Sequence, residues 1–178
     1  MGITMDLSDQ KTVVYLYKIC HYLLSAGFVF FIIAYLHFMT HTKSNYLLAG
    51  NGIECLGYAL LAIGYWFKGF FSILGLQTHV TIGHIVLAMY LTVSHILPIN
   101  EYSTPIDIVG IFGNLFLAKE TPLFILGVLF MPIFYIVKMC IFASTQNVFT
   151  WLIILGSICI AAGYILDAYV YSATVLKI

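Results

Sequence analysis

The sequence predicts an all-α integral membrane protein, a bundle of five transmembrane helices that forms a single domain over residues 1–178. Two observations predict this class. The chain is 62% hydrophobic and only 8% charged, whereas a soluble domain carries about 25% charged residues to solvate its surface. The apolar residues also gather in long runs, and roughly 20 of them in a helix cross a bilayer core of about 30 Å. We therefore expect the lipid bilayer to surround most of the chain.

Five apolar runs are long enough to cross a membrane. In lipid, backbone N–H and C=O groups must bond to one another within the segment, so each run is expected to be a helix. Short polar turns separate the runs, and Thr121 followed by Pro122 is typical of a helix start. The predicted helices cover about residues 13–38, 46–67, 78–97, 122–142 and 149–171.

One long connection, residues 98–120, separates the third and fourth predicted helices. It contains an apolar run at about residues 105–118. That run is too short to span the membrane and too apolar for a free loop. We therefore predict an interfacial or re-entrant helix in this segment.

The positive charges predict the orientation. The chain has seven lysines and no arginine, which argues against a nucleic-acid partner. In a five-helix arrangement, Lys11, Lys18, Lys68 and Lys138 fall on the N-terminal side, and Lys43, Lys119 and Lys177 fall on the other. Because cytoplasmic loops are enriched in lysine, this bias places the N-terminus in the cytoplasm.

Histidine is the residue type that most strongly indicates chemistry. All six histidines lie within or at the ends of the first and third predicted helices: His21, His37, His41, His79, His84 and His95. Ionisable groups in membrane segments are costly and mark functional sites, and imidazole is the usual axial ligand of haem b. The two helices run parallel, so the residues predicted to bind haem form an inner layer, His21 and His84, and an outer layer, His37 and His95.

Helical phase limits how many haem groups the histidines can hold. His84 and His95 are 11 residues apart, which is about 20° of rotation, so they share a face. His21 and His37 are 16 residues apart, which is about 160°, and they point to opposite faces. One bis-histidine site is therefore favoured over two.

A metal ion is the alternative use of the outer histidines. His37 and His41 form an HxxxH pattern on one helical face, and His95 and Glu101 are expected nearby. Imidazole and carboxylate ligands of this kind suit zinc, copper or iron.

Two acids lie inside predicted membrane helices, Glu54 in the second and Asp167 in the fifth. Glu54 lies on a stripe of glycines that repeats every seven residues, and Asp167 follows Gly163 by four. Since small residues let helices approach closely, we expect both acids to face protein. They indicate either a proton relay or protonated carboxyl groups that bond across helices.

Three function classes follow from these residues. The first is a subunit of an electron-transfer or respiratory membrane complex, with haem b bound between the first and third helices. The second is a non-catalytic accessory or scaffolding subunit, held by other membrane subunits because its loops are short. The third is a small transporter or proton-conducting protein that uses Glu54 and Asp167. The sequence carries no P-loop, GxGxxG or GxSxG motif and leaves open whether the chain is an enzyme.

Overall fold

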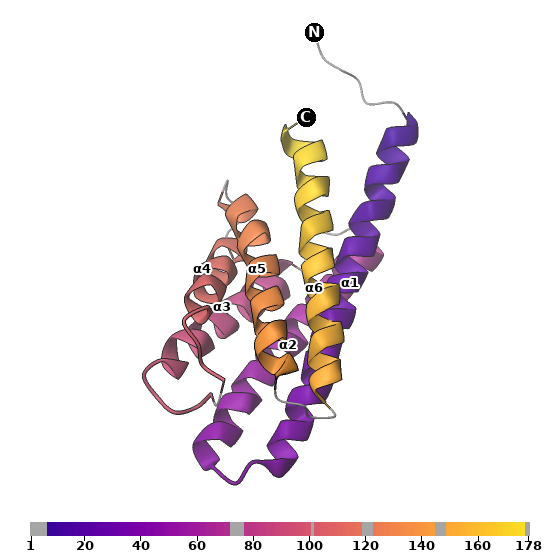
Figure 1. The fold of residues 1–178 in the computed structure, drawn as a ribbon. Helices are drawn as coiled ribbons and strands as arrows, with labels where there is room; N and C mark the ends of the chain where they lie inside the picture. Colours follow the sequence, from indigo (N-terminus) through magenta and orange to yellow (C-terminus); the bar gives the residue numbers. More distant parts are fainter. Residues whose placement is uncertain (1–6, 72–76, 101, 119–122, 145–148, 177–178) are drawn as a thin grey trace.

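The computed structural model describes residues 7–71, 77–100, 102–118, 123–144 and 149–176, and these residues form six α-helices (Figure 1). The helices are α1 (Leu7–His41), α2 (Asn45–Phe71), α3 (Gln77–Ser94), α4 (Asp107–Leu117), α5 (Phe124–Ala143) and α6 (Thr150–Tyr171). A π-helical turn, η2 (Ser172–Leu176), follows α6. The all-α prediction is confirmed for this part of the chain.

Four of the helices are long and apolar enough to cross a membrane: Gln10–His41, Asn45–Phe70, Phe124–Ala143 and Thr150–Thr174. They identify the chain as a multi-pass helical membrane protein whose apolar helices contact lipid. Two further predicted segments are also helices, but both are shorter than these four candidate spans. The predicted helix at 78–97 ends at Ser94, and the predicted segment at 105–118 is α4.

The first helix is longer than predicted. It was expected at residues 13–38, but it begins at Leu7 and ends at His41. The prediction followed only the apolar run. Helix propagation adds one hydrogen bond for each residue fixed, so polar residues at both ends extend the helix beyond the run.

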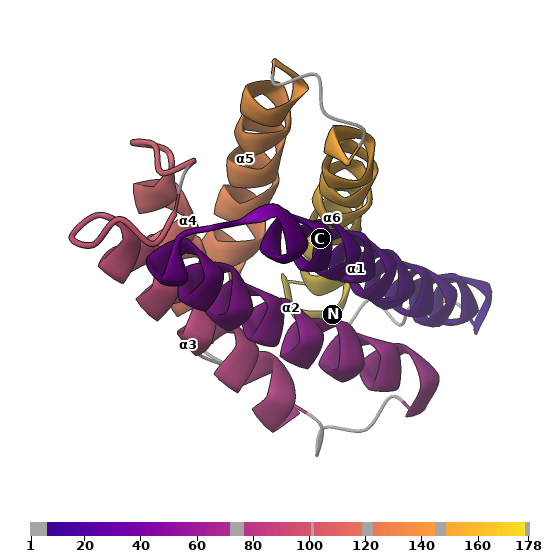
Figure 2. The same cartoon turned by 90° about the horizontal axis from the view of Figure 1, so that it is seen from below.

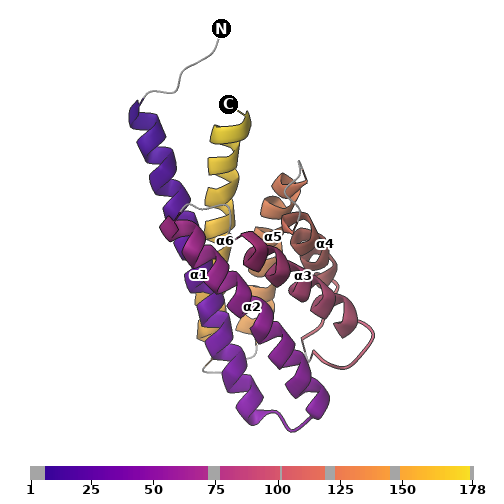
Figure 3. The ribbon, with the colours of Figure 1, turned by 180° about the vertical axis from the view of Figure 1, so that it is seen from behind.

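The helices pack in a closed ring. Each helix contacts its neighbour in the chain, and α6 returns to pack along α1. Figure 2 shows this bundle from below, and Figures 1 and 3 show the start of α1 and the end of α6 at the same end. We call that end the terminal face and the other end the opposite face.

The short helix α4 changes the expected side of Lys138. With α4 reversing the chain once more, α5 runs from the terminal face toward the opposite face (Figure 1). Lys138 therefore lies near the opposite face, where it pairs with Asp107 at the start of α4, and its predicted position on the N-terminal side is wrong. Lys119 and Lys177 lie outside the described residues.

Close contact between α1 and α6 depends on glycine. A Cβ atom at Gly163 would lie 2.7 Å from Leu24 Cγ and 3.1 Å from the Cys20 carbonyl oxygen. A Cβ at Gly156 would lie 2.9 Å from the Gly27 carbonyl oxygen. The backbones therefore approach as closely as the predicted glycine stripe requires, and this contact turns Asp167, four residues beyond Gly163, toward α1.

Candidate functional site

The bundle buries two of the six histidines. His21 is 1% exposed and His84 is 0% exposed, whereas His37 is half-buried and the remaining three, His41, His79 and His95, are exposed. Both buried rings contact Tyr65. Its ring centroid lies 5.6 Å from that of His21 and 6.1 Å from that of His84. Tyr65 thus occupies the space in which a cofactor shared by these two histidines would have to lie.

His84 forms hydrogen bonds through both ring nitrogens. Its Nδ1 lies 2.8 Å from Asn114 Oδ1, and its Nε2 lies 3.0 Å from the Tyr65 hydroxyl. The amide nitrogen of Asn114 donates to the Gly110 carbonyl oxygen, so the Asn114 oxygen must face His84. Nδ1 therefore carries the proton, and Tyr65 donates to Nε2.

These contacts do not fit the predicted bis-histidine haem site. Neither nitrogen of His84 is available to an iron atom without loss of a buried hydrogen bond. In the outer layer, the His37 ring stacks on Phe149 at 3.4 Å, and His95 is exposed at the end of α3. Haem binding stays an untested prediction of the sequence, and the contacts of His84 argue against it.

Of the residues predicted to form the outer metal site, His37 and His41 lie close together. The rings of His37 and His41 lie 4.2 Å apart, and His41 Nδ1 bonds to the His37 carbonyl oxygen. Glu101 falls outside the described residues. Metal binding at these side chains remains a prediction.

A different group of metal-ligand side chains meets between α1 and α6. Cys20, His21 and Asp167 each offer a ligand atom within 4.8 Å of the others. However, His21 Nδ1 and Cys20 Sγ both bond to the Tyr17 carbonyl oxygen, at 2.6 and 3.0 Å. Asp167 contacts this pair only through Cys20 Sγ, at 4.0 Å. The backbone of α1 thus already holds two of the three ligands.

A pocket of about 370 Å³ opens beside this group toward the terminal face. We call it the terminal pocket. Its lining combines apolar side chains with buried polar ones: Val13, Val14, Tyr17, His21, Lys68, Phe124, Asp167, Val170, Tyr171 and Thr174. Asp167 is 7% exposed and His21 is 1% exposed, so these two side chains lie deep in it.

The second buried acid lies toward the opposite face. Glu54 is 4% exposed, and its Oε1 accepts a 2.7 Å hydrogen bond from the Tyr58 hydroxyl. Within the described residues, its Oε2 has no hydrogen-bond partner, although Tyr35 and Tyr90 lie close enough to interact electrostatically. The prediction that Glu54 and Asp167 face protein is therefore confirmed.

A buried ion pair lies near Glu54. Lys138 Nζ lies 2.7 Å from Asp107 Oδ1 and also donates to the Tyr102 carbonyl oxygen at 2.7 Å. A small cavity, lined by both Lys138 and Glu54, has a volume of about 10 Å³, which suffices for one water molecule.

Two pockets meet at Tyr35. This side chain lines the small cavity beside Glu54, and it also lines a pocket of about 190 Å³ that contains His41, Asn51 and Tyr102. We call the larger of these the opposite pocket. Tyr35 thus separates the opposite pocket from Glu54.

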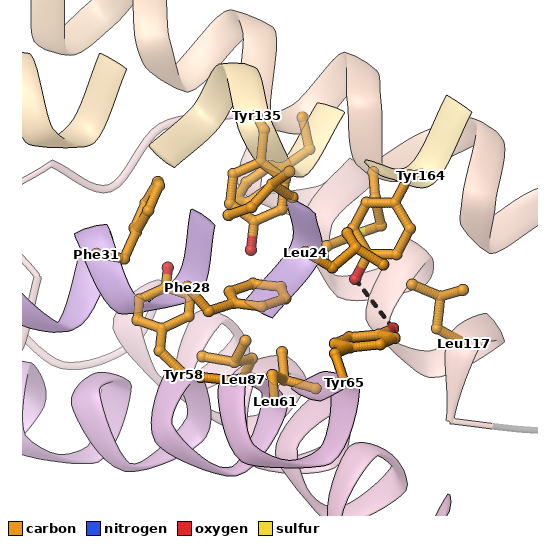
Figure 4. Close-up of a cluster of buried hydrophobic side chains, with 14 of the residues drawn as sticks. Leu24, Phe28, Phe31, Tyr58, Leu61, Tyr65, Leu87, Leu117, Tyr135 and Tyr164 are labelled. Carbon is orange, nitrogen blue, oxygen red and sulfur yellow. Dashed lines mark hydrogen bonds between the residues drawn. The ribbon is translucent and has the colours of Figure 1, made fainter. Parts of the chain in front are cut away.

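Buried tyrosines lie close to each of the two buried acids. Tyr164 lies 3.4 Å from Tyr65, hydroxyl to hydroxyl, and the single proton of Tyr65 is donated to His84, so Tyr164 is the donor in this pair. The Tyr135 hydroxyl has no well-formed hydrogen bond within the described residues, but it lies near the Tyr58 hydroxyl and within electrostatic range of Tyr164 and Glu54. Figure 4 shows this hydroxyl pointing into the core between Tyr58 and Tyr164.

We call this series the ladder. From the terminal pocket to Glu54 it consists of Asp167, His21, Tyr65, Tyr164, Tyr135, Tyr58 and Glu54. Its ends contact α1 at Cys20 and Tyr35, which are 15 residues apart, or about 22 Å along the helix. Phe28 stacks between Tyr58 and Tyr65, with centroid distances of 5.7 and 6.0 Å, and separates the ladder's two halves on the α2 side.

The sequence did not point to the ladder's tyrosines. In an apolar run, tyrosine resembles any other aromatic core residue. One signal was present, because Tyr58 and Tyr65 lie four and eleven residues after Glu54 and therefore share its helical face. The tyrosines of α5 and α6 carried no comparable signal, since only the ring of helices brings them to α2.

Comparison with protein-family models, with curated proteins and with solved structures finds no match for this chain.

Proposed function

We propose that the protein conducts protons across the membrane through the ladder. One observation carries this proposal. Two buried acids lie toward opposite ends of the bundle, each close to a pocket, and a series of buried tyrosines lies between them. Glu54 and Asp167 are thus the proton-relay residues of the third function class.

The energetic cost of the ladder supports a functional role. Placing ionisable groups inside a membrane bundle is unfavourable, and such groups mark proton and substrate pathways. Among the described residues, Glu54 Oε2 and the Tyr135 hydroxyl are buried without a well-formed hydrogen bond. A packed apolar core would be more stable without such atoms. The ladder extends about 22 Å of the roughly 30 Å core, so proton transfer along it crosses most of the barrier.

The side chains of the ladder suit protons better than larger ions. Each tyrosine hydroxyl and each imidazole can both donate and accept a hydrogen bond. The cavity at Glu54 has room for one water molecule, which is too little for a hydrated metal ion. In this proposal the Tyr135 hydroxyl rotates between Tyr164 and Tyr58, and a proton passes around Phe28.

The membrane topology forms part of the proposal. Helix α3 has 18 residues, which is about 27 Å, and would act as the fifth span. Helix α4 has 11 residues, which is about 16 Å, and is packed on α5. Because both chain ends lie at the terminal face, α4 would act as a short sixth segment that returns the chain toward that face. Lys11, Lys18 and Lys68 belong to helix ends at the terminal face, which supports a cytoplasmic N-terminus.

Proton flux into liposomes provides the test. The purified protein is reconstituted with a trapped pH-sensitive dye, and a potassium gradient with valinomycin drives protons inward. We expect wild-type flux to fall at least about tenfold, toward the rate of empty liposomes, in Glu54→Gln and in Asp167→Asn. Ser157→Ala, a buried position outside the ladder, is the control and should retain the flux. Wild-type flux equal to that of empty liposomes would exclude the proposal.

Orientation has a separate test. A membrane-impermeant thiol reagent is applied to intact cells that carry Lys43→Cys or Lys11→Cys. Labelling at position 43 but not at position 11 is expected, and the reverse pattern would place the N-terminus outside. The electron-transfer and scaffolding hypotheses, with their partner subunits, remain predictions.

A further inference from the structure

The terminal pocket has an apolar wall and a polar floor. Val13, Val14 and Val170 line its wall, together with the rings of Phe124 and Tyr171, whose centroids lie 5.4 Å apart. Asp167 and His21 form the floor. A volume of about 370 Å³ is within the range of small-molecule sites, which are mostly apolar with a few polar groups.

The floor presents hydrogen-bond acceptors. His21 uses its Nδ1 hydrogen for the Tyr17 carbonyl oxygen, so its Nε2 keeps a lone pair. The Asp167 carboxyl is 7% exposed, and its hydrogen-bond contact with Cys20 is a long one, at 4.0 Å. A buried carboxylate of this kind is stabilised by a cation or a strong donor.

Aromatic side chains add to the preference for a cation. Tyr17, Phe124 and Tyr171 all line the pocket, and aromatic faces attract ammonium groups in desolvated sites. Lys68 also lines the pocket and lies in electrostatic range of Asp167. Lys68 is only half-buried, however, and its long stem lets the ammonium group move toward the membrane surface when another cation binds.

We infer that the terminal pocket binds a protonated lipophilic amine, with the ammonium group against Asp167 and His21 and the apolar body along Val13, Phe124 and Val170. The inference deepens the proposed function and rests on it in one respect. If the ladder conducts protons, Asp167 is the group at which they enter it. An amine bound at Asp167 then competes with protons for the same carboxyl group, and the protein exchanges amines for protons.

The competition between amine and proton involves several neighbours of Asp167. The titratable or charged groups that face it are Tyr17, Cys20 and His21 of α1, Tyr65 and Lys68 of α2, and Tyr164 of α6. One bond changes in the exchange: the O–H bond of the protonated Asp167 carboxyl breaks, and its proton passes to water. The bound amine keeps its own proton, and a proton held by Asp167 leaves through the pocket.

Three phenyl-containing ligands of similar size and different charge test whether the pocket prefers a cation. Phenethylamine is a cation at pH 7, phenethyl alcohol is its neutral counterpart, and phenylpropionate is an anion of similar size. Binding to the purified full chain in detergent is measured by titration calorimetry. We expect the amine to bind at least about tenfold more tightly than either of the other ligands.

Two variants connect the binding to the pocket. Asp167→Asn should weaken amine binding roughly 30-fold, because one partner of a buried charge pair is lost. Lys68→Gln should strengthen it, because a competing cation is removed. Equal binding of the amine and the alcohol by wild type would overturn the inference, and so would tight phenylpropionate binding that depends on Lys68. The ligand comparison uses wild-type protein and does not depend on whether a variant folds.

Glu54→Gln separates this inference from the proposed function. Glu54 lies at the far end of the ladder, so this variant should lose proton flux and keep amine affinity. Amine binding without wild-type proton flux would exclude the proposed function alone. Proton flux without amine binding would exclude the pocket inference alone.

Discussion

Lys138 Nζ and Asp107 Oδ1 lie 2.7 Å apart in a buried ion pair that joins α5 to the start of α4. The Lys138 side chain is 7% exposed and the Asp107 side chain is 0% exposed. Asp107 Oδ2 also accepts a hydrogen bond from the Thr104 backbone N–H at 2.8 Å. The pair thus fixes the connection between α3 and α4 as well as the position of α4.

Breaking this pair should strongly destabilise the protein. Asp107→Asn leaves the Lys138 ammonium group buried without a counter-charge, beside neutral acceptors such as the Tyr102 carbonyl oxygen. We expect a loss of about 3–5 kcal/mol in the free energy of unfolding, measured by denaturant titration in mixed micelles. The double variant Asp107→Leu/Lys138→Met removes both charges and should recover most of the loss. Equal losses in the single and double variants would contradict a role for the charge pair.

The Tyr135 hydroxyl should matter for proton flux and not for stability. It is buried, and its nearest hydrogen-bonding neighbour among the described side chains is the Tyr58 hydroxyl, at the limit of hydrogen-bond geometry. Tyr135→Phe therefore removes at most one weak hydrogen bond and should change the unfolding free energy by about 1 kcal/mol or less. Proton flux in liposomes should nevertheless fall at least about tenfold, because a step of the ladder is lost. Unchanged flux in a stable Tyr135→Phe protein would place the proton path elsewhere.

The contact between His84 and Asn114 should stabilise the packing of α3 on α4. Asn114→Leu keeps the volume but leaves His84 Nδ1 without its acceptor, which should cost about 1–3 kcal/mol in the unfolding free energy. Asn114→Asp is the matched comparison, since it keeps an acceptor oxygen at the same position. A larger loss for Asn114→Asp than for Asn114→Leu would show that the added charge outweighs the hydrogen bond.

Optical spectra test the haem prediction directly. Both nitrogens of His84 are hydrogen-bonded, so we expect protein purified from haem-supplied cells to show no b-type α-band in a reduced-minus-oxidised spectrum. An α-band that disappears in His84→Ala would show that His84 exchanges its hydrogen bonds for iron.

Gly163 should tolerate no large side chain. A Cβ there would already lie 2.7 Å from Leu24 Cγ and 3.1 Å from the Cys20 carbonyl oxygen. Gly163→Leu should therefore separate α6 from α1 and cost about 1–3 kcal/mol or more in the unfolding free energy. Gly52→Leu is the control, because a Cβ at Gly52 meets only Met39 Cε, at 3.8 Å. A Gly163→Leu protein as stable as this control would contradict the close packing.

Part of the candidate site could be predicted from the sequence. Glu54 and Asp167 could be placed facing protein, because glycines on the same helical faces allow another helix to approach. His21 and His84 could be singled out as polar groups in apolar runs. The partners of His84 could not, since Tyr65 and Asn114 come from two other helices and hydropathy does not report which faces meet.

The sequence by itself determined that this chain is a multi-pass helical membrane protein. Apolar runs in lipid must satisfy their own backbone hydrogen bonds, and only helices of sufficient length do so. The tertiary structure decided that α4 reverses the chain, that Lys138 pairs with Asp107, and that buried tyrosines of α2, α5 and α6 lie between Glu54 and Asp167. These features depend on the rotation and closure of the helix ring, which places side chains far apart in the sequence within a few ångströms of one another.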